Sequence, residues 1–177
     1  MSKVADRYAE ALFAVAKSEN QLLEYVAQAK LVLNSFDEKW LRFFNASKIS
    51  RTEKKNVLKN GYATSVNRYF LNFMNILIDK NRINLILEIM NKFIGVCNQE
   101  LNIKLAYVYA PRKITLAQTE LIQKGLEEKF QAKIEIIEKI DPSLISGIKV
   151  VVENQVIDSS LKTRIDNLKD DLLKEGR

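Results

Sequence analysis

The hydrophobic periodicity of this chain changes near Asn102, and no other feature of the sequence constrains the fold as strongly. Before this point, apolar residues recur at the spacing of three and four residues that is typical of amphipathic helices. After it, the stretch IKLAYVYA (103–110) alternates with a period of two and is rich in strand-forming residues. The sequence therefore predicts an α+β protein, with a helical domain over residues 1–102 and a small sheet-containing domain over residues 103–177.

Six helical segments are predicted in the first part, and together they make a compact six-helix bundle. Ser50 and Glu53 have the spacing of a capping box, and Gly61 is expected to end that helix. Ser65 is expected to cap the fifth helix. The predicted segments run over residues 2–17, 22–36, 40–44, 50–61, 65–80 and 83–101.

The second part has the order β-α-β-β-α and predicts a small mixed sheet. Strands are expected over residues 103–110 and 133–140, joined by a helix that Thr115 and Gln118 cap, and this crossover makes the two strands parallel if they pair. A hairpin follows, with Asn154 as the residue best able to take a positive φ. The final helix starts at Ser159 or Ser160 and carries one narrow apolar stripe, made of Leu161, Ile165, Leu168 and Leu172.

Composition argues against most catalytic classes. The 177 residues contain no histidine, which is the commonest general base and metal ligand, and one cysteine, which excludes an internal disulfide and a CxxC site. Glycine is scarce, and neither GxGxxG nor GxxxxGK(S/T) appears, so the sequence has no glycine-rich phosphate loop. Cys97 is interpreted as a small core residue. No apolar run approaches the roughly 20 residues that span a bilayer, and the start MSKVADRY has no signal-peptide pattern, so we expect a cytosolic address. We predict no catalytic residue, no cofactor and no metal site.

The charge balance leaves two further hypotheses open. A net charge of +6 favours acidic partners, although the 28 basic and 22 acidic residues are interleaved as on an ordinary solvated surface. Tyr107 and Tyr109 share one face of a predicted strand, as base-stacking aromatics do in RNA-binding sheets, so a small basic nucleic-acid-binding module is the alternative. An enzyme built on Asp141 and Asp158 has less support, because both stand where bends and helix starts need side-chain acceptors.

Two predicted helices carry more apolar surface than the outside of a bundle requires. Apolar residues cover about 200° of the helix at residues 2–17 and about 220° of the helix at residues 65–80, whereas about half of that is enough for one buried face. The second helix could simply be the centre of the bundle. Alternatively, the two helices lie side by side and leave an exposed apolar groove for an amphipathic helix of another protein.

Three stretches resemble the delta subunits of bacterial F-type ATP synthases, whose mitochondrial equivalent is the oligomycin-sensitivity-conferring protein. RYAEALFAVA (7–16) is similar to the opening helix of that family, and FLNFMNILIDKNRINLILEIMNKF (70–93) to its two long helices and the break between them. The most specific stretch is IEIIEKIDPSLISGIKVVVENQVIDSSLKTRIDNL (134–168). The likeness covers essentially the whole chain. Ser146, Asn154 and Ser159 depart from glycine-containing positions of the family, but each is small or tolerant of turns.

This resemblance implies a non-catalytic subunit of the peripheral stalk, or stator, which links the catalytic head to the membrane sector and resists torque during ATP synthesis and ion transport. The helical domain would bind the N-terminal helix of an alpha subunit, and the C-terminal domain would bind the b subunits. One copy per complex is expected at the cytoplasmic face of the cell membrane, reaching the membrane only through the complex and binding no nucleic acid.

The resemblance also assigns candidate contact residues, because the groove of the family lies between its first and fifth helices. The candidates for the alpha-subunit helix are Tyr8, Ala11, Leu12, Val15, Phe73, Ile76 and Lys80. The candidates for the b subunits are Lys162, Arg164 and Lys169.

Overall fold

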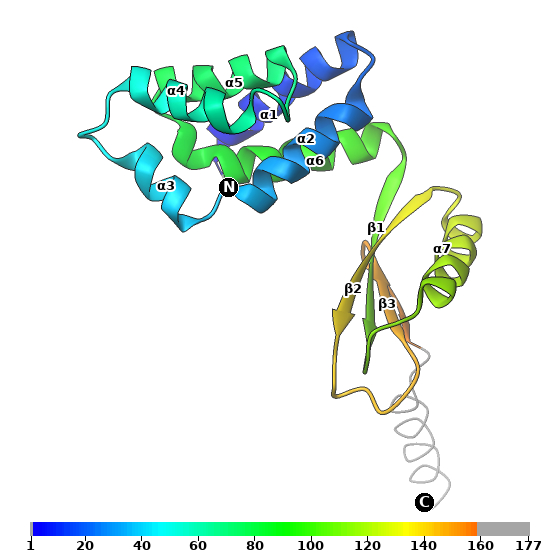
Figure 1. Cartoon of the computed structure of the whole chain (residues 1–177). Helices are drawn as coiled ribbons and strands as arrows, with labels where there is room; N and C mark the ends of the chain where they lie inside the picture. The colour runs from blue at the N-terminus through cyan, green and yellow to red at the C-terminus, as the bar shows by residue number, and fades with distance from the viewer. Residues whose placement is uncertain (1, 159–177) are drawn as a thin grey trace, which may run out of the picture. The chain divides into compact units, whose positions relative to one another are not determined.

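The computed structural model describes residues 2–158, and its contacts divide the chain into two compact units, Met1–Glu100 and Leu101–Arg177. The predicted division fell after residue 102. The described residues form an α+β fold, as predicted, with seven α-helices and one four-stranded sheet (Figure 1). Among these residues no helix is both long enough and apolar enough to cross a bilayer.

The N-terminal unit is helical throughout, and its short polar connections are typical of helices packed beside their neighbours in sequence. A single 3-10 turn, η1, separates its last two helices. The elements are α1 (Lys3–Ser18), α2 (Leu22–Ser35), α3 (Glu38–Asn45), α4 (Arg51–Tyr62), α5 (Arg68–Asp79), η1 (Ile83–Leu85) and α6 (Ile86–Glu100).

The helix starts confirm one predicted cap and correct another. Ser50 and Glu53 form the predicted capping box at α4. The predicted cap at Ser65 is wrong, because the side chain of Asn67 accepts the N–H of Phe70 at 2.8 Å and α5 begins one residue after it. The buried Gln28 of α2 fixes this start, since its side-chain oxygen accepts the N–H of Asn67 at 3.0 Å.

Gly61 does not end α4, as the sequence suggested, but lies one residue inside it. A Cβ at this position would meet the ring of Trp40 at 3.1 Å. The glycine therefore serves close packing of an aromatic ring against the helix rather than the end of the helix.

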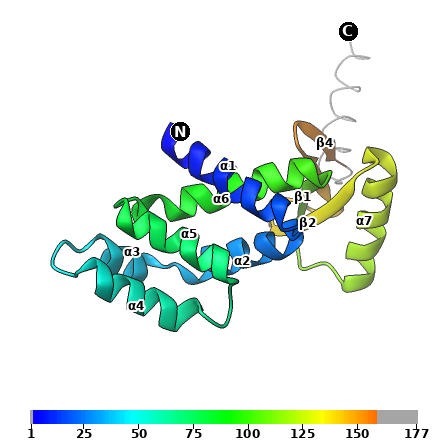
Figure 2. The same ribbon diagram turned by 90° about the horizontal axis from the view of Figure 1, so that it is seen from above.

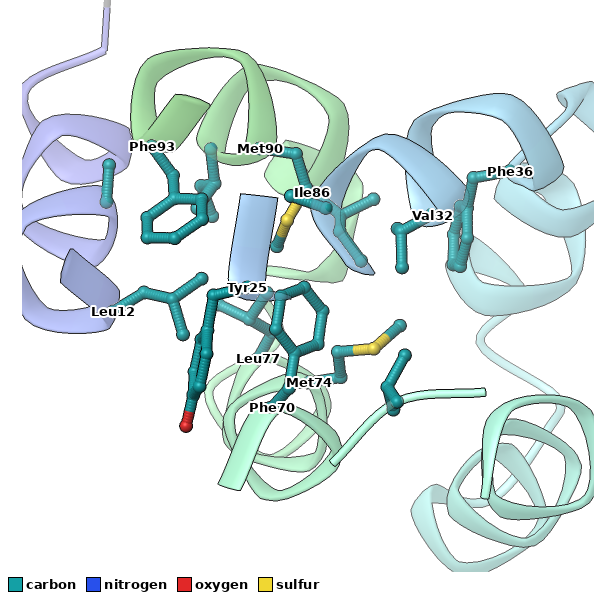
Figure 3. Close-up of a cluster of buried hydrophobic side chains, with 14 of the residues drawn as sticks. Leu12, Tyr25, Val32, Phe36, Phe70, Met74, Leu77, Ile86, Met90 and Phe93 are labelled. Atoms are coloured by element: carbon teal, nitrogen blue, oxygen red, sulfur yellow. The ribbon is translucent and has the colours of Figure 1, made fainter. Parts of the chain in front are cut away.

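The core of the N-terminal unit is centred on α6, against which both α1 and α2 pack (Figure 3). Seven residues of α6 are buried, compared with four of α5. The ring of Tyr25 lies 5.9 Å from that of Phe70 and joins α2 to α5. The labelled residues around this centre are Leu12, Tyr25, Val32, Phe36, Phe70, Met74, Leu77, Ile86, Met90 and Phe93.

The C-terminal unit is a mixed sheet with strand order β2-β1-β3-β4 and one described helix (Figures 1 and 2). β1 and β2 pair in parallel, as the predicted crossover requires, and the other neighbours are antiparallel. Thr115 and Gln118 form the predicted capping box of α7. The elements are β1 (Ile103–Ala110), α7 (Leu116–Phe130), β2 (Lys133–Ile140), β3 (Lys149–Val152) and β4 (Gln155–Asp158).

The hairpin between β3 and β4 turns one residue earlier than predicted. Glu153, not Asn154, has the positive φ, at 52°. Val152 and Gln155 are the last paired residues of the two strands. The turn therefore has two central residues, Glu153 and Asn154, and a two-residue hairpin turn restricts the backbone of both. The predicted final helix lies outside the described residues.

Candidate functional site

Helices α1 and α5 lie in contact, as the interpretation of two over-apolar helices requires. The rings of Tyr8 and Phe73 meet edge to face, with centroids 6.2 Å apart and an interplanar angle of 75°. On α1, Ala11 and Val15 follow Tyr8 at spacings of three and seven residues and therefore share its side of the helix. On α5, Tyr69 and Ile76 flank Phe73 in the same way.

The exposed apolar surface on these two helices is substantial. Val15 is 37% exposed, Ile76 41% and Tyr69 53%, while Tyr8 and Phe73 are half-buried and Ala11 is exposed. We call this surface the α1/α5 face and define it by Tyr8, Ala11, Val15, Tyr69, Phe73 and Ile76. Because α6 rather than α5 is the centre of the core, the chain's own N-terminal unit leaves part of the apolar surface of α5 uncovered.

Small residues on the opposite side of α1 explain how this face is presented. Ala5, Ala9 and Ala16 are buried, and α1 packs against α6. Leu12 is buried on the same side, so this side of α1 belongs to the core. Short side chains let two helix axes approach closely, and the residues on the other side of α1 face outward.

Polar contacts hold both ends of α1 against α6. The main-chain N–H of Ser2 donates to the carboxylate of Glu88 at 3.0 Å, and Lys92 pairs with Asp6. At the other end, Lys17 pairs with Glu100 at 2.6 Å. The N–H of Ser2, helped by the Lys92 ammonium, holds the pKa of Glu88 below its usual value, and the bond to Asp6 raises the pKa of Lys92. These contacts add to the packing that holds α1 against α6.

The candidate residues taken from the sequence do not all lie on this face. Leu12 is fully buried and belongs to the core, so it offers no surface to a partner and we remove it from the contact set. Lys80 is exposed at the C-terminal end of α5. Tyr69 was not among the candidates, although its spacing of four residues from Phe73 could have identified it. Lys162, Arg164 and Lys169 lie outside the described residues.

The remaining chemistry-bearing side chains have structural roles. Cys97 is buried, and the loss of water around its thiol raises the pKa to about 12, so it is a core residue rather than a nucleophile. Asp141 accepts the N–H of Ser143 at 3.0 Å, which closes the bend that its sequence position predicted. Within residues 2–158, no cluster of three or more acidic, cysteine or histidine side chains is placed to hold a metal ion.

The C-terminal unit has a hollow of about 880 Å³ along β2 and α7, and two side chains of α7 that line it bond to the main chain of β2. β2 is an outer strand of the sheet. The side chain of Gln123 donates to the carbonyl of Ile134 at 2.9 Å, and Glu127 accepts the N–H of the same residue at 3.3 Å. These bonds satisfy main-chain groups that an unpaired edge would expose to another strand.

Comparison with known proteins identifies the family of the chain. A sequence profile described as "ATP synthase delta (OSCP) subunit" matches residues 4–172. The chain is 36% identical over 171 residues to the ATP synthase subunit delta of Prochlorococcus marinus, which covers 95% of both chains. It is 32% identical over 167 residues to the corresponding subunit of Caldanaerobacter subterraneus, which covers 93% of both.

A solved structure shows the same fold. One chain in a cryo-EM structure of the Toxoplasma gondii mitochondrial ATP synthase hexamer superposes with a TM-score of 0.73 at 23% identity, covering 97% of this chain and 98% of that one. The fold and the family match define a class of structural, non-catalytic subunits. The chain belongs to the ATP synthase delta (OSCP) subunit family, and it is a structural subunit of the peripheral stalk rather than an enzyme.

Proposed function

We propose that the α1/α5 face binds the N-terminal amphipathic helix of an ATP synthase alpha subunit. The observation that carries this proposal is the exposed apolar surface on two helices in contact, centred on the Tyr8–Phe73 pair. An amphipathic helix lying along this surface would remove Val15, Tyr69 and Ile76 from water, at about 25 cal/mol for each Å² of apolar area. Lys80 would meet acidic side chains at the end of such a helix.

The C-terminal part, residues 103–177, would then bind the b subunits, with Lys162, Arg164 and Lys169 as candidate contacts. In this arrangement one copy of the protein connects the catalytic head to the membrane-anchored stalk, at the cytoplasmic face of the cell membrane. The connection resists the torque of the rotating shaft while ATP is made and ions cross the membrane. Burial of apolar surface can hold two proteins together without a catalytic residue, which agrees with a chain that lacks histidine.

The test is a calorimetric titration of the full chain with a synthetic peptide of the alpha-subunit N-terminus. Calorimetry suits this contact better than fluorescence, since Trp40 stacks against Phe36 and Phe44 and lies outside the α1/α5 face. The Ile76→Asp variant places a charge within the apolar contact, and we expect its affinity for the peptide to fall by about 30-fold or more. An absence of heat from the parent protein at two well-separated temperatures would contradict the proposal, because apolar burial changes the heat capacity and cannot give zero heat at both.

Leu31→Asp is the matched control. Leu31 is 39% exposed, close to the 41% of Ile76, but it belongs to α2 and not to the α1/α5 face. We expect Leu31→Asp to bind the peptide like the parent protein. Equal losses in the two variants would show that the charge acts through the fold and not through the contact.

A further inference from the structure

Most of the net positive charge of the chain lies on two neighbouring helices of the N-terminal unit. Residues 38–62, which comprise α3, α4 and the loop between them, contain seven basic and two acidic residues, a net charge of +5, whereas the whole chain carries +6. The two helices lie at the same end of the unit (Figures 1 and 2). This concentration of positive charge favours an acidic partner.

The acidic residues of this segment leave most of its positive charge unpaired. Glu38 lies 3.9 Å from Arg42, and the carboxylate of Glu53 is occupied in the capping box, where it accepts the N–H and the O–H of Ser50 at 2.9 and 2.8 Å. Four exposed cations of the segment form no ion pair within residues 2–158, namely Lys39, Lys48, Arg51 and Lys59. Carboxylates of a partner can therefore reach these cations without breaking a contact within the chain.

A small apolar hollow opens beside these charges. It has a volume of about 200 Å³ and is lined by Lys39, Trp40 and Phe43 of α3 and by Val57 of α4. Val57 is 37% exposed, although it belongs to a wall of the hollow. Pockets for small-molecule ligands usually measure about 300–1,000 Å³, so this hollow is better suited to one bulky apolar side chain of another protein.

The aromatic wall of the hollow is fixed by packing inside the unit. The ring of Trp40 lies 5.6 Å from that of Phe36, 5.7 Å from that of Phe44 and 5.8 Å from that of Tyr62. Gly61 leaves room for this ring, because a Cβ there would meet it at 3.1 Å. A preformed wall lowers the cost of binding a side chain. The same packing argues against a nucleic-acid partner, since base stacking needs an aromatic ring with a free face.

The hollow lies away from the α1/α5 face. On α4, Lys55 pairs with Asp79 of α5 at 2.6 Å, so this side of α4 is turned toward α5. Val57 follows Lys55 by two residues, or about 200° around the helix, and lines the hollow with α3 instead. A partner bound at the hollow and a helix bound at the α1/α5 face therefore use different residues.

We propose that α3 and α4 form a second docking surface, which binds an acidic segment of a partner protein. One bulky apolar side chain of that segment enters the hollow and removes the exposed surface of Val57 from water. Carboxylates on either side of this anchor meet Lys39 and the other exposed cations, which favours acidic segments over basic ones and speeds association. This surface goes beyond the proposed binding of the alpha subunit and does not depend on it.

The probe is a fluorescein-labelled synthetic peptide of about 14 residues, rich in glutamate and with one central leucine. We titrate it with the full chain at about 20 mM salt, where charge attraction is least screened, and follow its anisotropy. The unlabelled peptide is titrated against the emission of Trp40, which lines the hollow. We expect saturable binding that changes the Trp40 emission. Replacing the leucine by alanine should weaken binding by about 10-fold, and replacing the glutamates by lysines should abolish it.

Variants of the chain locate the contact. Val57→Asp places a negative charge in the hollow and should weaken binding of the acidic peptide by about 10-fold or more. Lys39→Glu reverses a charge at the hollow and keeps its apolar wall, so it should weaken binding by about 5-fold even if Val57→Asp does not fold.

Leu31→Asp is again the matched control, because Leu31 is 39% exposed on α2 and does not line the hollow. It should bind the acidic peptide like the parent protein. Val57→Asp should still bind the alpha-subunit peptide, so a failure of this proposal is distinguishable from a failure of the proposed function.

Three results would overturn the proposal. The first is no saturable binding of the leucine peptide at protein concentrations up to about 1 mM. The second is equal affinity for the leucine and alanine peptides, or equal binding by the parent, Val57→Asp and Lys39→Glu. The third is tighter binding of a single-stranded oligothymidine that competes with the peptide and is weakened by Lys39→Glu, because the surface would then be a nucleic-acid site. Losses in Val57→Asp and Lys39→Glu, with Leu31→Asp unchanged, support the docking surface.

Discussion

Leu12 and Val15 lie about one turn apart on α1 but differ in burial, and this difference predicts how much each residue contributes to the free energy of unfolding. Leu12 is fully buried in the core of the N-terminal unit, whereas Val15 is 37% exposed. Truncation of a buried leucine removes its transfer free energy and leaves a cavity, at about 2–5 kcal/mol. Val15→Ala removes less buried surface, and the higher helix propensity of alanine offsets part of the loss, so we expect a change of about 0–1 kcal/mol.

The assay is urea unfolding and thermal unfolding, each followed by the fluorescence of Trp40. This residue stacks on Phe44 at 5.7 Å and lies near Tyr62 at 5.8 Å, so it reports on the N-terminal unit even if the two units unfold separately. For a unit of this size, 1 kcal/mol corresponds to about 4–8 °C in Tm, and Leu12→Ala should therefore lower Tm by about 10 °C or more. Equal losses in Leu12→Ala and Val15→Ala would refute the assignment of Leu12 to the core and Val15 to the surface.

Three further predictions concern polar groups and the thiol. The folded state holds the pKa of Glu88 below its usual value, so the stability that Glu88 contributes is present above about pH 4.3 and is lost as the pH falls through the folded pKa. In urea, the parent and Glu88→Gln should differ at pH 7, and the difference should shrink as the pH is lowered further into the acid range. Ser50→Ala removes the cap of α4 and should lower the free energy of unfolding by about 1 kcal/mol, while Ser50→Asp should retain most of it. Cys97, with a pKa of about 12 and no exposed surface, should resist thiol reagents at pH 8 until urea unfolds the protein, and rapid labelling of the native state would contradict its burial.

Local signals in the sequence were sufficient to predict the helix caps whose partners are close together in the sequence. The capping boxes at Ser50 and Thr115 were both predicted, because the two partners lie within one turn and need no other part of the fold. Ser65 failed for the opposite reason. The start of α5 depends on Gln28, which is far away in the sequence, and nothing near Asn67 reveals that partner.

The candidate site shows a similar division. Helical periodicity identified α1 and α5 as having too much apolar surface, and both helices do leave apolar side chains exposed. Periodicity did not show that Leu12 is buried and Val15 exposed. Both lie on the wide apolar surface of α1, and the position of α6 decides which part of this surface joins the core. It also could not show that Val156, Val151, Tyr107 and Ile137 lie side by side across the four strands, because the strand order and register set this row.

The most direct test of the central claim is NMR mapping on the isotope-labelled full chain during titration with the alpha-subunit N-terminal peptide. The claim is that the α1/α5 face is the docking site for that helix. It predicts saturable shifts of the amide signals of Tyr8, Val15, Phe73 and Ile76, with Leu31 on α2 unchanged. Saturable binding that leaves α1 and α5 unshifted and moves signals elsewhere would contradict it.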